Sequence, residues 1–234
     1  MLVLAPFRRG GHHRGVPPPP SSPGEVDLPV VGRGRLLVAA PRLGDPNFER
    51  AVVVVIEHDD DGTLGLVLNR PTTVPVAEVV APWAEVAAMA PPAVVFAGGP
   101  VSPQVAVGLA TVSPSWVGAW QAVVGDVGVV DLSADPPVQD ADAGGVPGEP
   151  GAGFGGAAGG RAGGRPAVRI FAGYAGWGPG QLRDELRAGA WFVVDGQPDD
   201  LIGSDPDGLW RRVLRRQPGR LRLLASFPAD PAAN

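Results

Sequence analysis

The sequence predicts an α+β fold, in which one domain holds a bent, mixed β-sheet that is rich in hairpins and could approach a barrel, packed by a few helices. Three observations predict it. Apolar runs of strand length recur along the chain, helical stretches are interleaved with them, and hairpin signals are as strong as crossover signals. Apolar residues make up 44% of the 234 residues, which is enough for a core without disulfides or metals.

The first half of the chain alternates apolar runs with turn residues. Leu36 to Ala40 predicts a buried strand, and Asp45 followed by Pro46 suits the start of a short helical turn. The β-branched run Ala51 to Ile56 is the strongest strand signal. Turn residues 59–62 return the chain as a hairpin to a partner strand at 64–68, and 74–89 is partly helical with a break at Pro82; strands are expected at 94–97, 105–111, 121–124 and 127–132.

Two stretches of biased composition interrupt this pattern. Residues 1–31 include Pro17 to Pro20 and predict a disordered, Pro/Gly-rich tail. Residues 139–167 hold eleven glycines and three prolines, too few side chains for a packed element. We interpret 139–167 as a flexible insertion within one domain, 32–234. A linker between two domains is the alternative, although the remaining chain is short for an independent core.

After the insertion the elements follow closely. Val168 to Ala172 predicts a strand, and Gly173 to Gly178 a glycine-rich turn. Pro179 to Arg187 has proline at its first helical position and glycine just beyond its end, which is typical of a helix. A strand is expected at 190–194, and a last helix at 205–216 capped by Ser204.

The composition excludes several classes of chemistry. The chain has no cysteine, no lysine among its nineteen basic residues, and three histidines, of which only His58 lies in the body. Schiff-base and P-loop lysines, thiol nucleophiles and cysteine-ligated zinc are therefore ruled out. No apolar run approaches the roughly 20 residues that span a bilayer. We expect no metal, no cofactor, no membrane partner and a cytoplasmic location, and we assign no catalytic residue.

Several segments together resemble one protein family. They read GRLLVAAPRLGDPNFERAVVVVIEH (34–58), GTLGLVLNRP (62–71), VVFAGGPV (94–101), VRIFAGYAGWGPGQLRDELRAGAWFVV (168–194) and LLASFPADPAAN (223–234). In this order they resemble the AlgH/YqgE family. The resemblance implies a bacterial cytosolic protein; some members are described as regulators of transcription, without an established DNA-binding motif or reaction. This chain departs from the family at the glycine-rich insertion, where a short helical connection is usual.

Two groups of residues are candidates for binding a small anionic ligand. The glycine-rich segment before the helix at 179–187 could present backbone amides to an anion, although the same glycines could simply permit a tight turn. Polar residues at the ends of the first hairpin could add a guanidinium, or could only cap turns. We expect both groups to line one cavity. The ligand-binding candidates are Asp45, Asn47, His58, Asn69, Arg70, Gly98, Gly99, Gly173, Tyr174, Gly176, Trp177 and Gln181.

These observations favour a non-enzymatic domain that binds a ligand or a protein partner and acts in transcriptional regulation. The alternative is a hydrolase or transferase for a small anionic substrate, using His58, Asp45 or Glu57 with Arg70. Direct DNA binding is a third reading, without a supporting motif. It depends on the C-terminal arginines, Arg211, Arg212, Arg215, Arg216, Arg220 and Arg222, which could contact phosphates or could be a solvated helix face.

Overall fold

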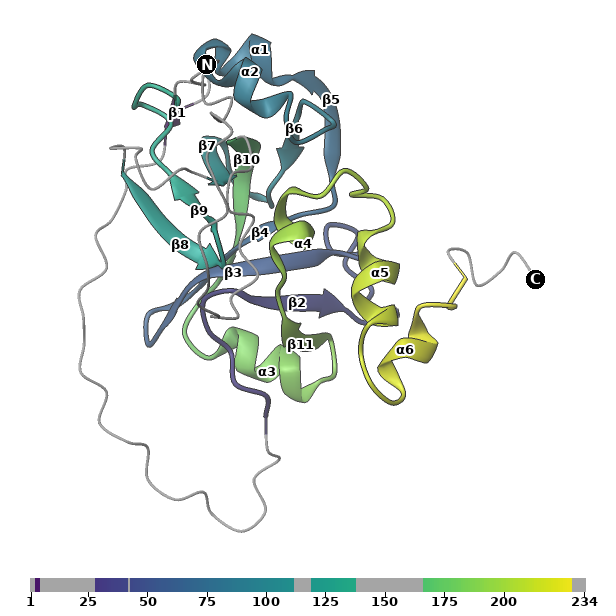
Figure 1. Ribbon diagram of the computed structural model, residues 1–234. Helices are drawn as coiled ribbons and strands as arrows, with labels where there is room; N and C mark the ends of the chain where they lie inside the picture. Colours follow the sequence, from purple (N-terminus) through teal and green to yellow (C-terminus); the bar gives the residue numbers. More distant parts are fainter. Residues whose placement is uncertain (1–2, 5–27, 42, 112–118, 138–165, 229–234) are drawn as a thin grey trace, which may run out of the picture.

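The computed structural model describes residues 3–4, 28–41, 43–111, 119–137 and 166–228 (Figure 1). Most of the predicted tail and insertion fall outside these ranges. The strands are β1 (Val3–Leu4), β2 (Arg35–Ala39), β3 (Val52–Asp59), β4 (Gly62–Val67), β5 (Pro71–Pro75), β6 (Val94–Ala97), β7 (Val101–Thr111), β8 (Trp120–Val124), β9 (Val127–Val130), β10 (Ala167–Trp177) and β11 (Trp191–Asp195). The helices are α1 (Val76–Val79), η1 (Ala81–Trp83), α2 (Ala84–Ala87), α3 (Gln181–Arg187), α4 (Pro198–Ile202), α5 (Leu209–Arg215) and α6 (Leu221–Leu224).

The strand β10 joins two curved halves of one sheet, which confirms the α+β prediction. The main path runs β11-β2-β3-β4-β10-β7-β9-β8, and every pair of neighbours along it is antiparallel. The first half of β10 pairs with β7 and, on its other edge, with β6; its last residues, Ala175 to Trp177, pair with β4. Figure 1 shows β2, β3 and β11 below β10 and the strands β7 to β9 above and beside it. Both halves therefore depend on this single strand.

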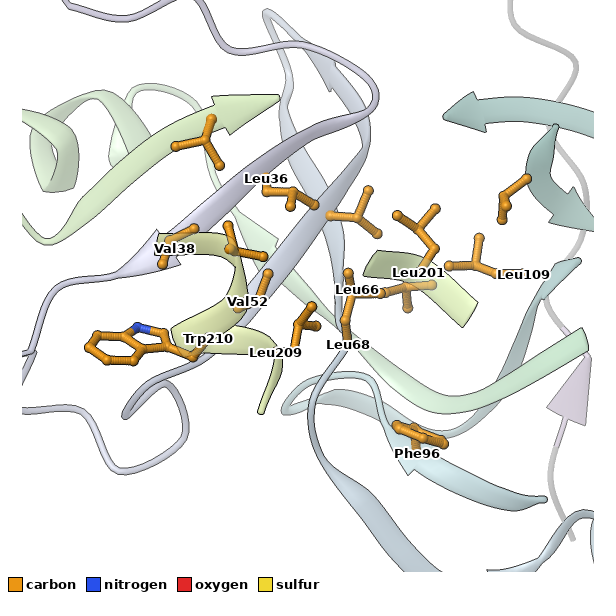
Figure 2. Close-up of a cluster of buried hydrophobic side chains, with 14 of the residues drawn as sticks. Leu36, Val38, Val52, Leu66, Leu68, Phe96, Leu109, Leu201, Leu209 and Trp210 are labelled. Carbon is orange, nitrogen blue, oxygen red and sulfur yellow. The ribbon is translucent and has the colours of Figure 1, made fainter. Parts of the chain in front are cut away.

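Helices α4 and α5 cover the face of the lower half and close the largest core. Leu36, Val38 and Val52 from the sheet lie against Leu209 and Trp210 of α5, all nearly inaccessible to solvent (Figure 2). The Trp210 indole N–H also donates a 2.9 Å hydrogen bond to the carbonyl of Ala39. Burial of these side chains, at roughly 1.5–3 kcal/mol each, fixes the position of α5.

A smaller core lies in the upper half. Trp83 of η1, which is fully buried, packs with Val86 of α2 and Ile170 of β10. Its indole N–H donates to the carbonyl of Leu132 at 3.2 Å. The partly helical stretch predicted at 74–89 is present as three short pieces, but α1 ends before Val80 and Pro82 lies inside η1 instead of marking the break.

Three sequence expectations differ from the structure. The predicted turn at Gly173 to Gly178 is a continuation of β10, because the backbone of the loop after β6 lies directly against it: a Cβ on Gly99 would lie 2.2 Å from the carbonyl carbon of Tyr174. Asp45 to Phe48 is a turn without a helix. The last predicted helix begins at Leu209 instead of Asp205, because the Asp205 carboxylate accepts from the Gly208 N–H and holds a turn there.

Candidate ligand-binding site

The predicted shared cavity is wrong in its geometry. Asn69 and Arg70 line a hollow with Trp210, whereas Tyr174 and Gly176 line hollows beside the start of β4. Trp177 pairs with Thr63 at the start of β4, and Asn69 follows the other end of that strand. At the rise of an extended strand these positions are about 20 Å apart. One small ligand therefore cannot contact both groups.

The hairpin residues are engaged in structural contacts. Asn69 is buried; its side chain accepts from the Val52 N–H and donates to the carbonyl of Arg50, both at 2.9 Å. The Asp45 carboxylate accepts from the backbone N–H of Asn47 at 2.8 Å and from its side-chain amide at 3.0 Å, at the surface. Asn69 therefore ties β3 to the end of β4, and the pair Asp45 and Asn47 shapes a turn.

Trp177 and Gln181 belong to a network around one carboxylate. The Glu185 carboxylate accepts from the indoles of Trp177 and Trp191, at 2.9 and 2.7 Å, and from the amide of Gln181 at 3.0 Å. Phe48 stacks on Trp177 with ring centroids 6.0 Å apart. The polar groups of Trp177 and Gln181 are thus already partnered within the protein.

The glycine candidates serve close packing of the backbone. A Cβ on Gly98 would lie 2.3 Å from the carbonyl oxygen of Gly173, which itself has a φ of 70° at a bulge in β10. The N–H of Gly98 donates to the carbonyl of Ala172 at 2.8 Å. Gly176 faces solvent beside Tyr174. These amides are therefore not gathered around an anion at a helix start.

The groups of the alternative enzyme reading are scattered. His58 is exposed, with Nδ1 2.7 Å from the Thr63 hydroxyl, and lines one hollow. Glu57 lines another and Arg70 a third. The C-terminal arginines are divided as well: Arg212 and Arg216 pair with Asp205 and Asp200. His58, Glu57 and Arg70 therefore do not share one hollow, and two of the six C-terminal arginines are held in ion pairs within the described chain.

The structure instead opens a cavity of about 370 Å³ between the two halves of the sheet. We call it the inter-sheet cavity. Its apolar wall comes from β3, β4, β7 and β9, and Tyr174 of β10 lies between the two sides. The lining residues are Arg33, Ile56, Glu57, Leu64, Ser102, Val105, Ala106, Val107, Gln121, Val129, Val130, Leu132 and Tyr174. Cavities of this size and mixed lining are typical of small-molecule sites.

Four side chains that line the inter-sheet cavity carry hydrogen-bond donors. No hydrogen bond or ion pair with a described residue engages the side chains of Arg33, Ser102, Gln121 and Tyr174. Burial lowers the pKa of Arg33, while the nearby Glu57 carboxylate opposes that shift. These side chains offer several hydrogen-bond donors beside an apolar wall, and Glu57 is the one carboxylate among them. The cavity is thus suited to a ligand head that accepts hydrogen bonds.

Ser102 stands out by its backbone. Its φ is 47°, and only one other non-glycine residue of the described chain, Arg50, also has a positive φ. Such a conformation is unfavourable for a side chain with a Cβ by about 1–2 kcal/mol. The strained backbone holds the serine at the cavity wall.

Ser102→Gly should raise the free energy of unfolding by about 1 kcal/mol relative to Ser102→Ala, because glycine accepts a positive φ without strain. Urea denaturation of the two variants measures this difference. Equal stabilities of the glycine and alanine variants would show that the backbone at 102 is not strained in solution.

Sequence reasoning missed most of this cavity. Of the twelve candidates only Tyr174 lines it, and Arg33, Ser102 and Gln121 were not singled out. Arg33 precedes β2, and Gln121 belongs to the short strand β8 far along the chain. The one available signal was that Tyr174 is the only tyrosine of the chain.

Comparison with known proteins places the fold in a family. A model of the AlgH-like family matches residues 36–222. The chain belongs to this family. Uncharacterised UPF0301 proteins are similar along most of their length: one from Streptomyces coelicolor is 48% identical over 206 residues, covering 86% of this chain and 94% of the relative, and one from Mycobacterium avium is 40% identical, covering 93% and 100%.

Two solved structures share the architecture. A crystal structure of a Corynebacterium diphtheriae protein has a TM-score of 0.68 at 28% identity, covering 86% of this chain and 95% of that one. The solution structure of the AlgH protein from Pseudomonas aeruginosa has a TM-score of 0.53 at 24% identity, covering 90% and 98%, which shows the fold alone. Among the described residues, no helix of this AlgH-like chain is long and apolar enough to cross a membrane.

Proposed function

We propose that this AlgH-like chain is a non-enzymatic binding domain that takes a small anionic ligand with an apolar body into the inter-sheet cavity. The observation that carries the proposal is the set of unpartnered donors, led by the Arg33 guanidinium, beside an apolar wall. A carboxylate head would satisfy these donors, and its apolar tail would be removed from water against Val107 and Val129.

The biological role that we propose is cytoplasmic, in the regulation of transcription through a protein partner. It rests on the family resemblance of the sequence segments. The proposal that the domain is not an enzyme is supported by the placement of His58, Glu57 and Arg70, which line different hollows. General acid–base chemistry needs its groups within about 3 Å of the same reacting atoms.

A thermal-shift series with octanoate and octanol tests the ligand class. Octanoate should stabilise the protein, because ligand at 100 times its Kd adds ~2.7 kcal/mol of apparent stability. Octanol, which lacks the negative charge, should bind at least about tenfold more weakly than octanoate. Arg33→Gln should remove the preference for octanoate, while Arg220→Gln, the same change at an exposed position of the C-terminal region, should keep it.

Val129→Phe provides the second arm, because a larger side chain occupies the cavity. It should abolish binding of both compounds, provided that circular dichroism shows an unchanged fold. Binding that persists in Val129→Phe would place the ligand elsewhere, and a panel of short- to medium-chain carboxylates that leaves the melting temperature unchanged would refute the proposed ligand class.

A further inference from the structure

The hollow that Asn69 and Arg70 line has a volume of about 190 Å³ and lies between the start of β3, the end of β4 and the start of α5. We call it the arginine hollow. Three guanidinium-bearing residues from separate parts of the chain, Arg50, Arg70 and Arg211, line it. The remaining lining residues are Glu49, Asn69, Asp207 and Trp210. The fold thus brings Arg70, at the end of the hairpin, next to Arg211 from the C-terminal region, two residues that the sequence alone did not connect.

Backbone carbonyls hold two of these guanidiniums in place. Arg70 donates to the carbonyl of Asn69 at 3.2 Å and to that of Glu49. Arg50 donates to the carbonyls of Phe227, at 3.0 Å, and Pro228, and its guanidinium lies 4.9 Å from the centre of the Trp210 ring. Carbonyl oxygens orient an arginine but leave its unit positive charge in place.

The backbone at the hollow is also fixed. Arg50 has a φ of 51°, and its carbonyl accepts the 2.9 Å hydrogen bond from the buried Asn69. The Trp210 ring on which Arg50 lies is itself anchored to Ala39. The arrangement is therefore set before any ligand arrives, which lowers the entropy lost on binding.

No carboxylate of the described chain forms an ion pair with these arginines. Ion pairs within 4.0 Å join Arg35, Arg187, Arg212 and Arg216 to acids, and none involves Arg50, Arg70 or Arg211. Burial lowers the pKa of Arg70 and of Arg50, and Arg211 contributes to the shift at Arg50 by repulsion. Glu49 acts in the opposite direction on both residues. The charge of the lining is thus in positive excess, with three guanidiniums against the two carboxylates of Glu49 and Asp207.

We propose that the arginine hollow binds the phosphate group of a small molecule. A tetrahedral oxyanion accepts several charge-assisted hydrogen bonds at once, and planar guanidiniums match its oxygen pairs. The hollow is too small for a nucleotide base in addition, and Arg50 already covers the Trp210 face that could stack on one. The site is separate from the inter-sheet cavity, with which it shares no residue.

Titration of the full chain with inorganic phosphate at fixed ionic strength tests this site, since fixed ionic strength removes general screening. Isothermal calorimetry should show saturable binding, and the indole N–H resonance of Trp210 should shift while that of the distant Trp83 should not. Arg211→Gln should weaken binding about tenfold or more, because one charge-assisted contact is lost.

Arg215→Gln is the matched control, because Arg215 is exposed on the same helix, one turn further along, and does not line the hollow. Its phosphate affinity should stay within about twofold of wild type. AMP should bind like inorganic phosphate, with the same dependence on Arg211, which would extend the site from the free ion to phosphate monoesters. Arg33→Gln should leave phosphate binding unchanged, so this result is independent of the octanoate experiment.

Three results would overturn the assignment. The first is that phosphate binds no better than chloride. The second is equal weakening by Arg211→Gln and Arg215→Gln, which would indicate a diffuse basic surface. The third is binding of duplex DNA that depends equally on both arginines while inorganic phosphate has no effect, which would favour a nucleic-acid surface.

Discussion

Arg169→Met should lower the free energy of unfolding by about 3 kcal/mol. Arg169 of β10 is 2% exposed and donates to the carbonyls of Leu201, Gly203 and Pro91 at 3.0, 2.7 and 3.2 Å. Methionine fills a similar volume but leaves these acceptors without a donor. It also relieves the desolvated charge and the unsatisfied Nε, so the net loss is smaller than three separate hydrogen bonds would give.

Chemical denaturation across a range of pH separates the contribution of the Arg169 hydrogen bonds from that of its buried charge. Burial lowers the pKa of Arg169 to about 10, well below the usual value of an arginine, so the unfolded chain binds more protons than the folded chain only near pH 10 and above. Stability from this group therefore rises with pH only there, and the difference between wild type and Arg169→Met should be constant from about pH 6 to 9. Arg169→Lys should not restore stability, because an ammonium cannot reach three carbonyls. A lysine variant as stable as wild type would show that charge alone matters.

Arg216→Gln should destabilise the protein by a similar ~3 kcal/mol. Both terminal nitrogens of Arg216 bond the Asp200 carboxylate, at 2.7 and 2.6 Å, and that side chain is 1% exposed. Without Arg216 the buried Asp200 carboxylate still accepts the 2.8 Å hydrogen bond from the Gln197 N–H, but it loses the positive charge that it pairs with. Thermal and urea unfolding measure the loss.

The neighbouring Arg215→Gln removes the same charge from the same helix and should change stability by no more than ~0.5 kcal/mol. The double variant Asp200→Asn with Arg216→Gln should lose less free energy of unfolding than the two single variants added together. Asp200→Asn removes the buried negative charge that Arg216→Gln alone would leave unpaired. Additive losses would mean that the pair is not formed in solution.

The hairpin of β3 and β4 was predictable because its determinants are local. The β-branched run at 51–56 and the turn at Asp59 to Gly62 specify pairing without reference to the rest of the chain. The segment Gly173 to Gly178 could not be read in the same way. Its glycines look like a turn, but Gly173 is needed because the backbone of Gly99, distant in sequence, lies against it: a Cβ on Gly173 would lie 2.7 Å from the Gly99 carbonyl oxygen.

Both hollows depend on such long-range placement. The inter-sheet cavity requires Arg33, Ser102 and Gln121 to meet, and each comes from a different strand or turn. The arginine hollow requires the start of β3 and the end of β4 to lie beside α5. Periodicity identifies the elements and their buried faces but carries no information on which ends of different elements become neighbours.

The shared strand has a consequence for synthesis on the ribosome. Thr111, at the end of β7, and Ala167, at the start of β10, are 56 positions apart, yet their residues pair. Until β10 is translated, β4 and β7 each present an edge whose hydrogen-bonding groups have not met their final neighbour. Open edges of apolar strands invite pairing with other chains. A nascent chain truncated before residue 167 should therefore be prone to aggregation. Once β10 is translated, it pairs with both β4 and β7 and covers the two exposed edges.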